Sequence, residues 1–127
     1  MKHPLLILAD VERLTDTLER SLNSAKVNAA KAKDRAHKLS DGGGLYMLLL
    51  PPSNTGKTRK LWRYKYRING REGLYAIGTF PEIGLADARK AHLAARCLVA
   101  RGIHPAHYAQ EKRRRLDAEE RRQKTGT

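Results

Sequence analysis

Residues 61–68 alternate between two kinds of side chain with a strict period of two. The even positions carry aromatic rings and one isoleucine, whereas the odd positions after the first carry Arg63, Lys65 and Arg67. Because successive side chains of a β-strand point to opposite faces of its sheet, this pattern predicts a strand with one apolar and one cationic face. The chain must therefore build a sheet that buries the rings and leaves the cations outside.

An Asn-Gly pair at residues 69–70 follows this strand and precedes a second β-like run at residues 71–77. Asn-Gly between two such runs favours the two-residue type I′ turn of a β-hairpin. That turn fixes the register and predicts the cross-strand pairs Ile68–Arg71, Arg67–Glu72, Tyr66–Gly73, Lys65–Leu74, Tyr64–Tyr75, Arg63–Ala76 and Trp62–Ile77. The cationic side of the hairpin then holds three cations, one acid (Glu72) and the small or apolar neighbours Leu74 and Ala76.

Apolar spacing and breaker residues divide the first half of the chain. An apolar stripe at three- and four-residue steps predicts a helix over residues 5–24, either as one piece or as a shorter helix capped by Thr15. Residues 25–38 have little periodicity and indicate a connector. The glycines at 42–44 oppose a helix, and the apolar run at 45–50, which two prolines follow, predicts a buried strand.

The second half of the chain ends in helical patterns. Residues 85–101 show helical spacing of apolar side chains, with Gly84, which lacks a capping oxygen, at the start and Gly102 in the usual stop position. Residues 106–124 mix charges of both signs and predict a solvated helix or a linker. The expected fold is α+β: a three-stranded antiparallel sheet packed on a helix, with an N-terminal helix and a basic C-terminal helical tail.

The net charge of +13 comes from 26 Lys and Arg against 13 Asp and Glu, and it points to a polyanionic partner such as nucleic acid. Residues 54–71 hold seven cations and no acid, whereas residues 112–124 hold seven cations diluted by three acids. The single cysteine excludes a disulfide framework and a cysteine-based zinc site. We therefore expect a cytoplasmic protein with no cofactor, no metal, and no membrane or small-molecule partner.

The predicted cationic face suits a phosphate backbone, which would supply the missing negative charge and release counterions on binding. A two-stranded ribbon also fits a DNA major groove, where arginines meet guanine edges and apolar side chains meet thymine methyl groups. The candidate phosphate contacts are Lys57, Arg59, Lys60 and Arg71, and the candidate groove contacts are Arg63, Lys65, Arg67, Leu74 and Ala76. Three alternatives stay open: an ordinary half-exposed sheet, a binder of double-stranded RNA, and a protein-interaction module that docks an acidic partner.

Six short motifs run in order along the chain. They are Leu-Thr-Asp-Thr at 14–17, Lys-Leu-Ser-Asp-Gly-Gly-Gly-Leu-Tyr at 38–46, Leu-Trp-Arg-Tyr-Lys-Tyr-Arg at 61–67, Ile-Gly-Thr-Phe-Pro-Glu-Ile at 77–83, Leu-Ala-Asp-Ala-Arg at 85–89 and Gly-Ile-His-Pro at 102–105. Together they resemble the amino-terminal domain of prophage-type tyrosine-recombinase integrases. The resemblance implies a sheet-and-helix domain that binds the arm-type DNA sites flanking the recombination crossover, with the sheet as the element that enters the groove.

The catalytic domain of that family supplies a nucleophilic Tyr that Arg and His activate, and its His-x-x-Arg motif starts at none of the five histidines in this chain. The resemblance therefore implies a non-catalytic, DNA-binding part of a phage or prophage integrase, at the bacterial nucleoid, with other integrase protomers as protein partners. It divides the chain into a helical segment and connector (1–37), an arm-type DNA-binding domain (38–105) and a basic tail toward a core-binding and catalytic region (106–127).

Overall fold

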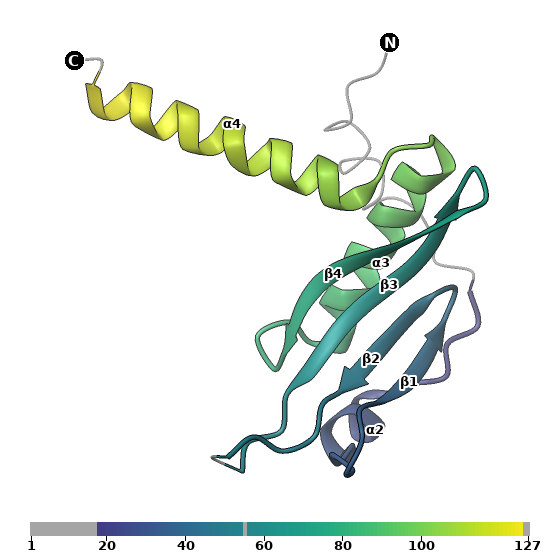
Figure 1. Cartoon of the computed structure of the whole chain (residues 1–127). Coiled ribbons are helices and arrows are strands. Elements are labelled where there is room, and N and C mark those ends of the chain that lie inside the picture. Colours follow the sequence, from purple (N-terminus) through teal and green to yellow (C-terminus); the bar gives the residue numbers. More distant parts are fainter. Residues whose placement is uncertain (1–17, 55, 126–127) are drawn as a thin grey trace.

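The computed structural model describes residues 18–54 and 56–125, which form four strands and three helices. The elements in chain order are α2 (Ser24–Ala29), β1 (His37–Gly42), β2 (Leu45–Leu49), β3 (Lys60–Ile68), β4 (Arg71–Phe80), α3 (Leu85–Ala100) and α4 (Pro105–Thr125). The strands make one antiparallel sheet in the order β1-β2-β3-β4, so the chain has the predicted α+β class. Figure 1 shows α3 lying across one face of the sheet and α4 projecting away from it.

The sheet has four strands, so the prediction of three was wrong. The additional strand is β1, which pairs with β2 from His37 opposite Leu49 to Gly42 opposite Leu45. The sequence pattern conceals this strand because it lies at an edge of the sheet and carries mostly polar side chains. Gly42 and the two glycines after it all have positive φ, and they form the tight connection that turns the chain back into β2.

The predicted N-terminal helix is wrong for residues 18–23, which are not helical. These residues run beside β1, and the Ser21 N–H donates to the Asp41 backbone oxygen at 3.1 Å. Their apolar spacing therefore places Leu22 in the core rather than forming a helical stripe. The rest of that prediction, including the cap at Thr15, lies outside the described residues.

The helices of the C-terminal half follow the predictions closely. α3 matches the span predicted over residues 85–101, and it starts after Gly84 without a hydrogen bond from any capping side chain. Gly102 follows α3 with a φ of 76°, in the left-handed region that ends helices. The basic tail is a helix, α4, which was one of its two predicted forms. Among the described residues, no helix has both the length and the apolar character that crossing a membrane requires.

The hairpin between β3 and β4 has the predicted turn, since residues 69 and 70 have positive φ angles of 50° and 77°. The six predicted pairs nearest the turn are confirmed. The seventh is wrong: Trp62 lies opposite Gly78 rather than Ile77, because the register shifts by one residue at a bulge. The shift does not disturb Arg63, Lys65 and Arg67, all of which lie between the bulge and the turn.

The face of the sheet that α3 covers holds the core. Its main cluster consists of Leu22, Val27, Leu45, Met47, Leu49, Trp62, Leu85 and Ala88. A second cluster lies under the hairpin and joins Tyr64 and Tyr66 of β3 to Ala95 of α3. The Tyr66 ring lies over Gly73, where any added Cβ would collide with it. The even-numbered rings of β3 are therefore buried, as the alternation predicts.

Asp41 is a fully buried carboxylate that ties three segments together. Its oxygens accept hydrogen bonds from Nε and Nη2 of Arg89 on α3, at 2.9 and 3.0 Å, and from the Leu22 backbone N–H at 2.9 Å. The Arg20 guanidinium lies 3.3 Å from the same carboxylate and donates to Nδ1 of His92. Burial alone would raise the pKa of Asp41, but the hydrogen bonds and positive charges around it outweigh burial and hold that pKa below its ordinary value.

We expect acid to destabilise this protein partly through Asp41. A carboxyl group whose pKa is lower in the folded state stabilises the fold above its unfolded pKa, and the contribution is lost as the pH falls through the folded pKa. For Asp41 the loss starts near its ordinary value of 3.8 and continues below it. Urea unfolding between about pH 6 and about pH 2.5 measures this loss, and the Asp41→Asn variant should show a flatter pH profile. Identical profiles for the two proteins would contradict this role of Asp41.

Candidate nucleic-acid interface

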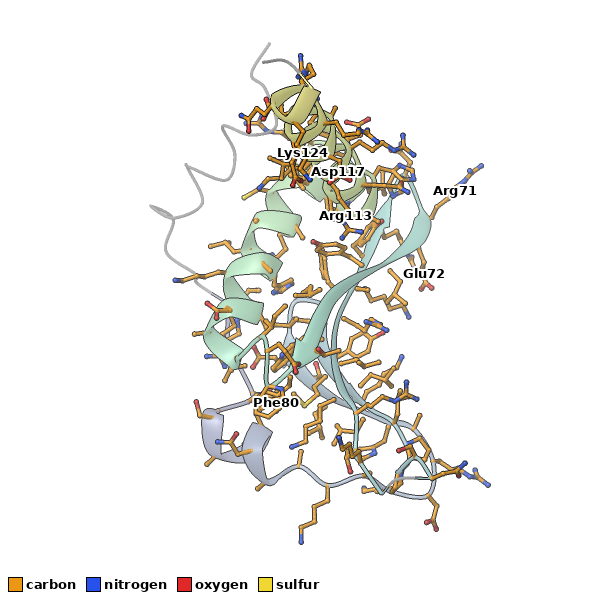
Figure 2. The ribbon with its side chains drawn as sticks, turned by 90° about the vertical axis from the view of Figure 1, so that its left-hand side faces the viewer. Arg71, Glu72, Phe80, Arg113, Asp117 and Lys124 are labelled. Atoms are coloured by element: carbon orange, nitrogen blue, oxygen red, sulfur yellow. The ribbon has the colours of Figure 1, made fainter. Side chains whose placement is uncertain are left out.

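The face of the sheet turned away from α3 carries Arg63, Lys65 and Arg67 of β3. We call it the cationic face and define it by the side chains that share it across β2, β3 and β4: Tyr46, Arg63, Lys65, Arg67, Glu72, Leu74 and Ala76. Figure 2 shows α3 on one side of the sheet, whereas Glu72 points away on the other side. None of the helices in the described residues covers the cationic face.

One carboxylate, that of Glu72, lies between two of the cations. Its Oε1 is 3.1 Å from Nη2 of Arg67 and 3.4 Å from Nζ of Lys65, and all three side chains are more than half exposed. The hydrogen bond from Arg67 contributes most to lowering the pKa of Glu72, and Lys65 adds to it. Three cations and one carboxylate leave two net positive charges on the cationic face.

Apolar side chains lie among these charges. Leu74 is 54% exposed and lies opposite Lys65, and the exposed Ala76 lies opposite Arg63. Water solvates such apolar surface poorly, so a partner that brings its own apolar groups to this face would bury it favourably. The cationic face therefore offers charged and apolar contacts side by side.

Two residues beside the cations, Tyr46 and Lys38, were not predicted as part of the site. Tyr46 pairs with Arg63 across β2 and β3, and the residue is 9% exposed. The Lys38 ammonium lies 4.8 Å from the centre of that ring. Because β1 was not predicted, Lys38 had no assigned face; the pairing of β1 with β2 places it beside the cationic face.

Comparison with known proteins agrees with this geometry. The model of the arm DNA-binding domain family matches residues 22–112, which is most of the chain. This chain belongs to the arm DNA-binding domain family. The matched residues include β1 to β4, α3 and every candidate contact residue.

Curated relatives of this arm DNA-binding domain are integrases. The prophage integrase IntZ of Escherichia coli K12 is 37% identical over 99 residues, which cover 76% of this chain and 23% of the relative. The integrase of Enterobacteria phage P4 is 37% identical over 97 residues, covering 75% of this chain and 21% of the relative. The integrase of Shigella phage Sf6 is 36% identical over 84 residues, covering 66% and 20%. The chain thus spans about a fifth of the length of these relatives. The resemblance of its motifs to the amino-terminal domain of prophage-type integrases is confirmed.

The candidate phosphate contacts of this arm DNA-binding domain lie at two ends of the sheet. Lys57 and Arg59 are exposed in the loop between β2 and β3, whereas Arg71 is exposed beside the hairpin turn. Figure 1 shows that these two places lie at opposite ends of β3. A strand of its length spans about 27 Å, so the two groups lie beyond the two ends of the cationic face. Arg71 pairs with Ile68, so its side chain starts from the opposite face at the hairpin end.

Lys60, the fourth candidate phosphate contact, lies elsewhere. Its Nζ donates to the backbone oxygens of Val27 and Asn28, at 2.8 and 3.3 Å, near the C-terminal end of α2. The same ammonium lies 5.2 Å from the centre of the Phe80 ring. Because Lys60 is an even-numbered residue of β3, it points to the face opposite Arg63, and we leave it out of the proposed interface.

An apolar pocket of about 400 Å³ lies between α3, β4 and α4, and Leu98, Tyr108 and Leu116 help to line it. His104, near this pocket, shares a hydrogen bond of 2.9 Å with the Tyr66 hydroxyl. Within residues 18–54 and 56–125, no three His, Cys, Asp or Glu side chains come together in a group that could hold a metal ion.

Proposed function

We propose that this chain is the arm-site-binding module of a phage or prophage integrase, which holds duplex DNA through its cationic face and does not itself cut DNA. The observation that carries the proposal is the open, doubly positive face built from Arg63, Lys65 and Arg67, with Leu74 exposed among them. Family membership and the integrase relatives support the same role in DNA integration and recombination.

The geometry suits the major groove of B-form DNA. The two-stranded β3–β4 ribbon fits the width of that groove, and its side chains then face the base edges. Arg63 and Arg67 carry N–H groups that can donate hydrogen bonds to guanine. Leu74 and Ala76 offer apolar contact to thymine methyl groups. Exposed cations at both ends of the ribbon would reach phosphates, and they would fix its position along the duplex.

The open alternatives make different demands on the partner. The major groove of an RNA duplex is deep and narrow, so side chains on a β-ribbon cannot reach its base edges. A docking module for an acidic protein would need charge complementarity, but neither the arm DNA-binding domain family nor the integrase relatives support that role. We therefore favour DNA, in the bacterial cytoplasm, with other integrase protomers as the protein partners.

A competition experiment tests the choice of nucleic acid. Labelled duplex DNA bound to the full chain is challenged with unlabelled DNA or RNA duplexes of equal length and sequence. We expect DNA to compete at least about tenfold better than RNA, and log affinity for DNA to fall linearly with log salt concentration. Equal competition by the two duplexes would reject the groove-reading assignment, and salt-independent binding would reject phosphate contact.

A further inference from the structure

Glu72 is the one acid among the seven side chains that define the cationic face, and it contacts two of the three cations there. We propose that Glu72 determines the DNA specificity of this face by competing with phosphate groups for Lys65 and Arg67. The inference rests on the proposed DNA-binding function, and it assigns a role to a residue that lowers the charge of its own binding surface. Stability is a weak explanation for these contacts, because ion pairs between well-exposed side chains contribute little to it.

Binding to DNA of any sequence depends on contacts with phosphate groups. A phosphate that approaches Lys65 or Arg67 meets ammonium and guanidinium groups that already lie 3.4 and 3.1 Å from a carboxylate. The carboxylate must then swing away or stay and repel the phosphate, and either response weakens the contact. Glu72 therefore penalises modes of binding in which this part of the face lies against the DNA backbone.

When the ribbon binds within the groove, base edges rather than phosphates face it. There Glu72 can stay in place, and its carboxylate can accept a hydrogen bond from a cytosine amino group. Its contact with Nη2 of Arg67 also holds the guanidinium in one orientation and leaves the other N–H groups to meet a guanine. The Glu72 carboxylate thus weakens binding little when the ribbon lies in the groove, but weakens it strongly when the face lies against the DNA backbone. This widens the difference in affinity between specific and non-specific binding.

The test compares Glu72→Gln with the unchanged chain on two probes. One probe is a duplex of random sequence, and the other is a duplex of equal length recovered from a random library by selection with the unchanged chain. On the random duplex we expect Glu72→Gln to bind about three- to tenfold more tightly, with the salt slope steeper by up to about one. The affinity ratio between the selected and the random duplex should fall by a similar factor.

Two further variants separate position from net charge. Glu82→Gln removes the same charge from the turn after β4, where Glu82 accepts a hydrogen bond from Thr79, and this variant should leave the affinity ratio unchanged. Glu72→Asp keeps the negative charge and should preserve most of the ratio. If Glu72→Gln behaves like Glu82→Gln while Arg63→Ala still weakens DNA binding, the role of Glu72 is rejected and the proposed function stands. If the unchanged chain binds neither duplex, both fail.

Discussion

Replacing Asp41 with Asn should lower the free energy of unfolding by about 2–4 kcal/mol. The substitution keeps the size and shape of the side chain but removes the negative charge that two guanidinium groups surround. Arg89 would then face a neutral amide in place of its ionic partner, and the amide NH₂ would replace one of the oxygens that now accept hydrogen bonds. Urea unfolding followed by the fluorescence of Trp62, the only tryptophan and a fully buried one, measures the change.

Asp34→Asn is the matched control for this prediction. Asp34 is exposed between α2 and β1, so the same chemical change there should alter the free energy of unfolding by less than about 0.5 kcal/mol. If Asp41→Asn proves too unstable to purify, the conservative Arg89→Lys substitution tests the same contact. Arg89→Lys keeps the positive charge but loses the bidentate hydrogen bond to the carboxylate. We therefore expect an intermediate loss of unfolding free energy. Equal stability of Asp41→Asn and Asp34→Asn would show that the network does not hold the fold together.

The cationic face could be predicted from the sequence because every constraint on it is local. Alternation along β3 sorts the side chains onto two faces, and the Asn-Gly turn fixes which residues of β4 lie opposite them. Neither step needs information from distant parts of the chain. The prediction failed at Trp62, which lies opposite Gly78 rather than Ile77. The local signal for the bulge is Gly78, because an isolated glycine inside a strand often marks one, but the predicted β-like run ended at residue 77 and did not include it.

Long-range contacts explain what the sequence did not reveal. In the sequence, Asp41 stands directly before three glycines and indicates only a turn. Its partners Arg20 and Arg89 lie 21 and 48 residues away along the chain. Lys60 reads as one more cation in a basic loop, but the carbonyl groups at the end of α2 bind its ammonium. In both cases the deciding partner belongs to another element, so only the assembled fold shows whether a charge is buried, paired or open to a ligand.

Removing both arginines of the groove set, Arg63→Ala with Arg67→Ala, should weaken binding to duplex DNA by about 100-fold near physiological salt and reduce the salt slope by about two. Each arginine supplies one positive charge and donors for a base edge or a phosphate, and both lie on the face opposite the core. The double variant should therefore unfold with nearly the same urea midpoint as the unchanged chain. Binding is measured by fluorescence anisotropy over a series of salt concentrations.

The control for this double variant removes two positive charges from the opposite layer of the molecule. Lys90 on α3 and Arg101 just after it are both exposed, and α3 lies on the side of the sheet away from the cationic face. Lys90→Ala with Arg101→Ala gives the same net charge, so its loss of affinity reports only the general attraction between a basic protein and DNA. We expect that loss to stay below about threefold, with an unchanged preference for the selected duplex. Similar losses in the two double variants would mean that net charge, rather than the cationic face, holds the DNA.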